Sequence, residues 1–220
     1  MFVLILFVFF GFTTSLNAAD EKSKEIEMPK TFVLGDPIKG SELVASCAAC
    51  HGIDGNSMVT DWPKLSGQNQ KYLYEQLLYF RDGSRMNALM MSVTPYLQTL
   101  TDNDLKDIAA FYSQYNSTVG QAKNDEEMLA LGTQLYRFGN IKKQIPACTS
   151  CHAVYGQGNS LAGYPSVAGQ QVGYLTSSLK AYRSKERNAG EGSLVMQGVA
   201  EKLSDDEIDA LANYMHGLYQ

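Results

Sequence analysis

The sequence predicts an all-α protein built from two tandem copies of one helical domain. Matching dipeptides recur at an offset of 102 residues, so that Trp62-Pro63 and Gly67-Gln68 in the first half correspond to Tyr164-Pro165 and Gly169-Gln170 in the second. An internal repeat of this length indicates two copies of one domain, and 220 residues suffice for two domains of about 100 residues each. No segment shows the sustained alternation of apolar and polar residues that is typical of a strand.

Three main helices are expected in the first half. The first runs from about residue 37 to residue 51, and apolar residues at helical spacing predict a second over 72–82. The third covers about 101–115, because Thr101 or Asp102 can accept hydrogen bonds from the free amides of the first turn. A methionine-bearing loop over 86–97 separates the second helix from the third.

The second half repeats this plan. Gly132 and Tyr136 hold the i and i+4 positions that Gly40 and Val44 hold in the first half, and residues 203–208 repeat the start of the closing helix. About nine extra residues, rich in lysine, interrupt the correspondence after the first helix of this half.

The ends and the middle of the chain divide it further. Residues 2–12 are apolar and small residues follow, which is typical of a cleaved secretory leader, although no Lys or Arg precedes the apolar stretch and a retained anchor is the alternative. The expected segments are a signal peptide over 1–19, an N-terminal tail over 20–36, a first domain over 37–116, a linker over 117–125 and a second domain over 126–220.

Both halves carry a Cys-x-x-Cys-His motif, and together these motifs use every cysteine of the chain and two of its three histidines. The motifs are Cys47 to His51 and Cys148 to His152. Two thiols one short turn apart can form thioethers to one haem, and the adjacent histidine then lies beneath the iron as an axial ligand. We therefore predict two covalent haem c groups, attached through Cys47, Cys50, Cys148 and Cys151, with His51 and His152 as iron ligands.

Other roles for the same residues fit less well. A structural zinc site needs four converging ligands from knuckles a short span apart, whereas 97 residues separate Cys50 from Cys148. A thioredoxin-like dithiol would follow a strand, but helices are expected before Cys47 and Cys148. Disulfides suit an exported protein, yet they leave the two adjacent histidines without a role.

The sixth ligand of each iron is expected to be a methionine, because the chain has nine methionines and one spare histidine, His216. Met196 lies alone between the second haem motif and the closing helix. In the first half Met86, Met90 and Met91 compete, and the parallel between Leu89-Met90-Met91 and Leu194-Val195-Met196 favours Met91, with Met90 as the runner-up.

With these motifs in place, the chain resembles class I cytochromes c, and within them the dihaem cytochrome c4 family. The resemblance rests on the paired haem motifs, the Pro63–Gln68 and Pro165–Gln170 loops, Met196-x-Gly198 and the Leu-Thr/Ser-Asp helix starts. It implies two cytochrome folds and a periplasmic electron carrier. It also implies that the carbonyls of Pro63 and Pro165 accept the Nδ1 hydrogen of the ligating histidines.

The family also suggests donors to the haem propionates, which need hydrogen bonds when buried. The candidate donors are Tyr72, Tyr174, Arg81 and Arg183. The alternative is that the tyrosines belong to the core and the arginines to the surface. The expected partners are membrane respiratory complexes and a terminal oxidase or reductase, and the expected role is electron transfer rather than enzymatic catalysis. A dihaem subunit of a sulfide- or thiosulfate-oxidising enzyme is the alternative.

Charge narrows the range of partners. The net charge of −5 and the absence of a basic run argue against nucleic acid binding. Basic residues do gather between residues 180 and 187, at Lys180, Arg183, Lys185 and Arg187. This basic group is either a docking face for an acidic partner or an ordinary solvated helix face.

Overall fold

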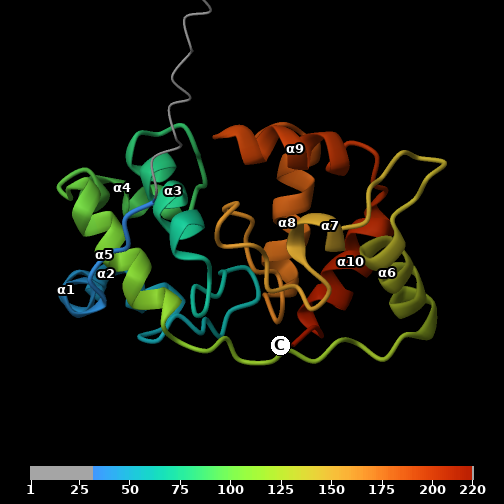
Figure 1. The fold of residues 1–220 in the computed structure, drawn as a ribbon, viewed down its shortest axis with the longest axis horizontal. Coiled ribbons are helices and arrows are strands. Elements are labelled where there is room, and N and C mark those ends of the chain that lie inside the picture. Colours follow the sequence, from blue (N-terminus) through green and yellow to red (C-terminus); the bar gives the residue numbers. More distant parts are fainter. Residues whose placement is uncertain (1–31, 220) are drawn as a thin grey trace, which may run out of the picture. The chain divides into compact units, whose positions relative to one another are not determined.

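The computed structural model describes residues 32–219, and these residues form helices joined by loops (Figure 1). Two isolated β-bridges, Asn140 with Ile145 and Asn159 with Tyr164, are the only strand-like pairings within this range. The predicted signal peptide, and the predicted tail as far as residue 31, lie outside the described residues. Between 32 and 219, no helix has the length and apolar character needed to cross a membrane.

The first half opens with two short helices, α1 (Pro37–Leu43) and α2 (Ala45–His51). The single helix expected over 37–51 is thus broken at Val44, whose side chain is buried in the core. Asp36 accepts hydrogen bonds at the start of α1, and its own backbone N–H donates to the Asp107 carboxylate at 2.7 Å. Residue 36 of the predicted tail therefore lies against the first half.

The remaining helices of this half are α3 (Gln70–Arg81), α4 (Thr94–Leu97), α5 (Asp102–Ser113) and a 3₁₀ turn, η1 (Met90–Ser92). The α5 start is the one expected, because Thr101 and Asp104 form a reciprocal capping box. The expected methionine loop differs from prediction, since η1 and α4 give part of it helical structure.

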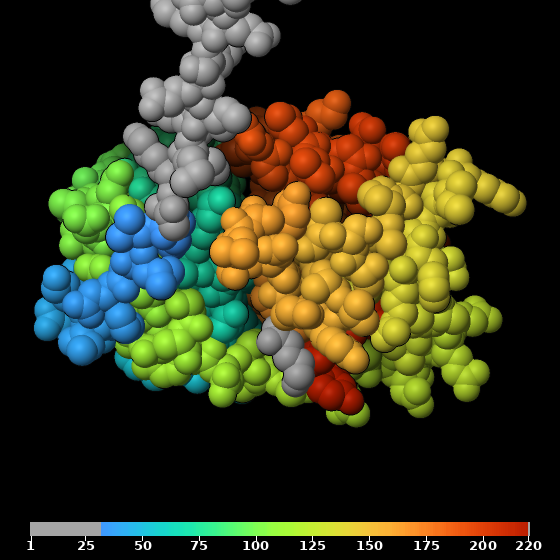
Figure 2. All heavy atoms as spheres, in the orientation of Figure 1, coloured from blue at the N-terminus to red at the C-terminus, as the bar shows by residue number. Residues whose placement is uncertain are grey.

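The second half comprises α6 (Glu126–Phe138), α7 (Thr149–His152), α8 (Val172–Arg183), α9 (Glu191–Ala200) and α10 (Asp205–His216). The extra residues after α6 form a loop closed by backbone hydrogen bonds between Asn140 and Ile145. This loop projects from the surface, in yellow in Figure 2, and its Ile141 side chain is almost fully exposed. The second half also contains α9, a helix that the sequence pattern did not predict.

Glycines let the first and last helices of each half approach closely. α1 packs on α5 and α6 packs on α10. A Cβ at Gly40 would collide with the carbonyl of Asp107, and a Cβ at Gly132 would collide with that of Ala210. The repeated glycine therefore marks the same helix crossing in both halves.

The core of each half is built on the helix that closes it. In the first half Ile108 and Tyr112 of α5 pack with Val44, and in the second half Ile208 of α10 packs with Tyr136. These two cores leave the Cys-x-x-Cys-His segments lining a space between α3 and α8.

Candidate haem sites

Each Cys-x-x-Cys-His motif lies on or beside a short helix. α2 carries the first motif, and α7 carries the end of the second, with Cys148 as its N-terminal neighbour. None of the four cysteines forms a disulfide. Burial, together with the neighbouring thiol, raises the pKa of Cys47 to about 11.

A zinc site receives no support from the geometry of the described residues. Over residues 32–219, no three His, Cys, Asp or Glu side chains converge in a way that could hold a metal ion. The motifs are therefore separate sites, one in each half.

Both motif histidines have their tautomer set by a prolyl carbonyl, as the family resemblance implied. Nδ1 of His51 lies 2.8 Å from the carbonyl oxygen of Pro63, and Nδ1 of His152 lies 2.9 Å from that of Pro165. A carbonyl can only accept, so Nδ1 carries the hydrogen and Nε2 keeps its lone pair. Burial lowers the pKa of both imidazoles despite these bonds, which favours the neutral form that a metal ion requires.

One cavity of about 890 Å³ reaches both histidines. Apolar side chains of α3 and α8, among them Leu73 and Leu175, line it together with His51 and His152. Its size and mostly apolar lining suit a large, mostly apolar group. A smaller recess of about 140 Å³ adjoins His152 and Met196.

The candidate methionines differ in their surroundings. Met196, on α9, lines the cavity and packs against the second core. Met90 and Met91 both line the cavity, but Met90 packs against the apolar cluster of Phe80 and Leu97, whereas Met91 is 54% exposed. Met86 lines the same cavity and is 71% exposed. More than one methionine thus remains available to the first haem.

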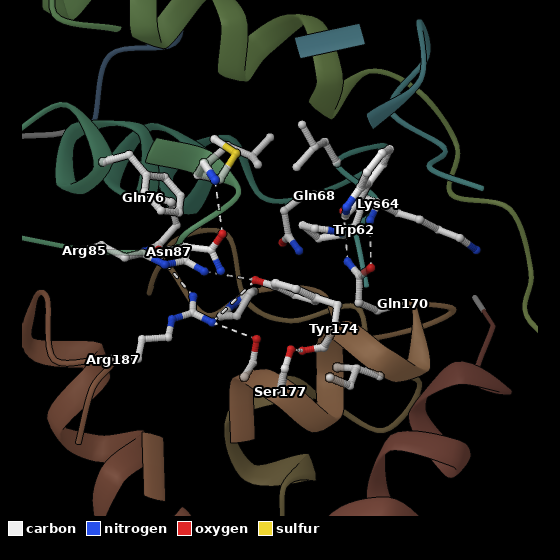
Figure 3. A pocket seen from close by; sticks show the side chains of 18 of the residues that line it. Trp62, Lys64, Gln68, Gln76, Arg85, Asn87, Gln170, Tyr174, Ser177 and Arg187 are labelled. Atoms are coloured by element: carbon white, nitrogen blue, oxygen red, sulfur yellow. Dashed lines mark hydrogen bonds between the residues drawn. The ribbon is translucent and has the colours of Figure 1, made fainter. Parts of the chain in front are cut away.

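Two arginines that the sequence analysis did not single out for the site point into the cavity. Figure 3 shows Arg85 and Arg187 directed toward Tyr174. The Arg187 guanidinium donates to the Tyr72 hydroxyl at 2.6 Å and to the Gln76 side-chain oxygen at 3.1 Å, and Arg85 donates to the same Gln76 oxygen at 2.6 Å.

Within the part of the chain that the structure describes, these two cations lack an acidic partner. Among residues 32–219, neither Arg85 nor Arg187 forms a salt bridge, and the buried Nε of Arg187 has no hydrogen-bond partner. Burial opposes ionisation of the Tyr174 hydroxyl, yet Arg187 and Arg85 lower its pKa overall. This end of the cavity therefore favours an anion, and the carboxylates of haem propionates fit it.

Arg81 and Arg183, the arginines that the family resemblance offered for this role, bind other groups. Arg81 binds the carbonyl of Leu100 and the carboxylate of Asp102, at the start of α5. Arg183 binds the equivalent groups at the start of α10, Leu203 and Asp205. Both therefore tie the second main helix of their half to the closing helix. Tyr72 and Tyr174 do line the cavity, as expected.

The four basic residues between 180 and 187 do not form one continuous surface either. Lys180 and Arg183 share Asp205, and Arg187 is buried at the cavity. Lys185 remains exposed, in a left-handed turn just after α8. His216, the histidine outside both motifs, is half-buried, and its Nδ1 lies 2.8 Å from the carbonyl oxygen of Gln170.

Two all-α units, each with a haem-attachment motif beside its own histidine–proline pair, define a protein of the cytochrome c class. The sequence matches the cytochrome c family over residues 38–115 and 129–218. It is 41% identical over 191 residues to cytochrome c4 of Stutzerimonas stutzeri, covering 84% of this chain and 90% of that protein.

The solved structures agree with the sequence match. The crystal structure of reduced recombinant cytochrome c4 from Pseudomonas stutzeri superposes with a TM-score of 0.78 at 41% identity, over 84% of this chain and all of the other. A thiosulfate dehydrogenase electron acceptor of Stutzerimonas stutzeri is 32% identical over 180 residues, or 80% of each chain. The chain belongs to the dihaem cytochrome c4 family, and its two cytochrome c domains imply two covalently bound haem c groups.

Proposed function

We propose that this protein is a periplasmic electron carrier, which accepts single electrons from a membrane respiratory complex and delivers them to a terminal oxidase or reductase. Bound haem iron supplies the chemistry, by cycling between the ferric and ferrous states. The observation that supports the proposal best is that His51 and His152 line one cavity. Two redox centres on the walls of one cavity suit exchange of electrons within the molecule.

The proposed attachment follows the motifs. Cys47 and Cys50 would hold the first haem, and Cys148 and Cys151 the second. His51 and His152 would present Nε2 to iron, held in that orientation by their prolyl carbonyls. Met196 would be the sixth ligand of the second haem, and Met91, with Met90 as the alternative, that of the first.

The remaining residues have supporting roles in this proposal. Arg85 and Arg187 would neutralise propionates, and the apolar walls of α3 and α8 would keep water from the haem faces. No general acid or base is needed, because electron transfer forms and breaks no covalent bond in a substrate.

The proposal can be tested with the mature protein isolated from the periplasmic fraction. A haem assay should give two haems per chain, and a redox titration should give two one-electron steps with methionine-ligated spectra. Membranes that contain the donor complex should reduce it, and an oxidase or reductase should reoxidise it. A single haem, or a protein that stays with the cytoplasmic fraction, would contradict the proposal.

A second candidate function is that of electron acceptor to a thiosulfate-oxidising enzyme. It is suggested by the similarity of 80% of the chain to the thiosulfate dehydrogenase electron acceptor of Stutzerimonas stutzeri. Mixing the oxidised protein with a thiosulfate dehydrogenase and thiosulfate would test it. Reduction of both haems within turnover time supports the acceptor role, whereas reduction only by respiratory membranes favours the general carrier.

A further inference from the structure

Two buried glutamine side chains, one from each domain, form hydrogen bonds with the backbone of the other domain. Gln170 accepts a hydrogen bond from the backbone N–H of Lys64 at 2.8 Å and donates to the carbonyl of Lys64 at 2.9 Å. Gln68 does the same to Ser166, accepting from its N–H and donating to its carbonyl, each at 2.8 Å. Both glutamines are 6% exposed, and Figure 3 shows Gln170 beside Lys64.

The residues bound by the two glutamines, Lys64 and Ser166, come directly after the prolines whose carbonyls orient the histidines. The peptide unit between Pro63 and Lys64 offers its carbonyl oxygen to Nδ1 of His51 and its N–H to Gln170. One planar group thus joins the histidine of the first domain to a glutamine of the second. The peptide between Pro165 and Ser166 joins His152 to Gln68 in the same way.

Hydrogen bonds in such a chain strengthen one another. When the N–H of a peptide donates to a good acceptor, its carbonyl oxygen becomes more negative and accepts more strongly. A stronger bond at Nδ1 makes the imidazole a better electron donor through Nε2 and restricts rotation of the ring. The glutamine of one domain can therefore act on the histidine of the other.

We propose that Gln68 and Gln170 are positioning residues that work crosswise: Gln170 tunes the axial histidine of the first domain, and Gln68 that of the second. The inference rests on the proposed ligation by His51 and His152. Its consequence is that docking of a partner that shifts one domain against the other would change the potential of both haems.

The alternative is that the glutamines merely hold the domains together, and the chain offers a matched control for it. Gln171, next to Gln170, also crosses between the domains, donating to the carbonyl of Ser57 at 2.6 Å, but it makes no bond to the Pro63–Lys64 peptide. Gln170→Met and Gln171→Met each keep the length of the side chain and remove an interdomain contact. Only the first should affect His51.

The experiment measures the potential of each haem in the two variants and the parent, with nuclear Overhauser contacts to Leu73 or Leu175 assigning each haem to its domain. Gln170→Met should raise the potential of the first-domain haem, because a weaker imidazole donor stabilises ferric iron less. The second-domain haem should stay within error, and Gln171→Met should leave both unchanged. Hydrogen exchange at the Lys64 amide should quicken about tenfold or more in Gln170→Met only.

The reciprocal variant completes the test. Gln68→Met should shift the potential of the second-domain haem and not that of the first. This variant also tests the crosswise assignment if Gln170→Met fails to retain both haems. Equal shifts of both haems, or a Gln171→Met effect as large as that of Gln170→Met, would overturn the crosswise assignment. Failure of the underlying ligation is distinguishable, since the parent protein would then lack histidine-ligated haem spectra.

Discussion

At the scale of single residues, the hydrogen bonds around each motif leave one imidazole nitrogen free. A prolyl carbonyl accepts a hydrogen bond from Nδ1–H of His51 and of His152, which fixes the tautomer and leaves Nε2 free, while burial favours the neutral ring. The sixth position then decides the potential, because a thioether ligand favours ferrous iron relative to an imidazole.

Met196→His should leave two covalent haems but lower the potential of the second-domain haem, by on the order of 0.1 V within the ~0.8 V span that axial ligands cover. The reason is that imidazole, a stronger donor, stabilises ferric iron. A redox titration checks the potential, and the weak ferric methionine-to-iron charge-transfer band should disappear for one haem. An unchanged spectrum and potential would remove Met196 from the proposed site.

Replacing the competing methionines of the first domain by alanine should distinguish Met90 from Met91. Met91→Ala is expected to abolish methionine ligation of the first haem, while Met90→Ala, which removes a contact with the Phe80 cluster, should mainly reduce stability. Visible and paramagnetic NMR spectra report the ligation. Loss of ligation in Met90→Ala alone would show that the register is wrong by one residue.

At the scale of helices, the close crossings and the helix starts fix where the motifs lie. α1 meets α5 at Gly40, which brings the chain into α2 and its cysteines. Glu207 completes the capping box of α10 and also binds Lys143 of the loop after α6 at 2.8 Å. The closing helix of the second domain is thus linked to the segment that precedes its haem motif.

Gly40→Ala should destabilise the first domain by about 1–3 kcal/mol, as overpacking does, because its Cβ would meet the Asp107 carbonyl. Gly198→Ala is the matched control, since a Cβ there meets nothing within 4 Å and alanine favours a helix. Thermal unfolding of both variants checks this. Equal stability of the two would mean that α1 can move away from α5 without cost.

Lys143→Met should lower the free energy of unfolding of the second domain at neutral pH by up to about 1 kcal/mol, because the Lys143–Glu207 ion pair that it removes is partly exposed. Burial raises the pKa of Glu207, but the bonds from Lys143 and Ser204 outweigh it and lower the pKa overall.

A carboxyl whose pKa is lowered in the folded state adds stability above its unfolded pKa of about 4.3, and this stability is lost as pH falls through the folded value. The difference between Lys143→Met and the parent should therefore vanish in strongly acidic solution. Denaturant titrations at several pH values measure it. A difference that persists at low pH would assign the effect to packing of the lysine stem.

At the scale of the whole molecule, charge is unevenly divided. Residues 20–120 and 121–220 each hold nine Lys and Arg, but thirteen and ten Asp and Glu, so the two parts carry −4 and −1. Burial of Arg187 and pairing of Lys180 with Asp205 leave Lys185 as the exposed, unpaired cation of the basic group within the described residues. Such charges act on encounter rates more than on affinity.

Lys185→Glu should slow electron transfer to an acidic acceptor several-fold at low ionic strength, and the difference should shrink as salt is added. Stopped-flow kinetics measures the rates, and Lys180→Gln, which removes a lysine paired within the protein, is the control. Both haem spectra should stay as in the parent. Rates that respond neither to salt nor to Lys185→Glu would indicate docking through apolar contacts.

The sequence by itself determined the features that depend on neighbours in the chain. The thioether spacing of Cys47 and Cys50, the adjacent His51 and the Thr101 cap are local, and the repeat showed that each occurs twice. For the same reason the all-α class and the haem number could be predicted before any contact was known.

Only the tertiary structure decided which distant groups meet. The family resemblance offered Arg183 as one candidate for the propionates, but α8 ends there and the following turn brings Arg187 into the cavity instead. The hydrogen bonds between Gln170 and Lys64 join residues 106 positions apart, and no local pattern encodes them. The physical reason is that cap and motif geometry is set by a few backbone dihedrals, whereas the partner of a buried polar group is set by how the helices pack.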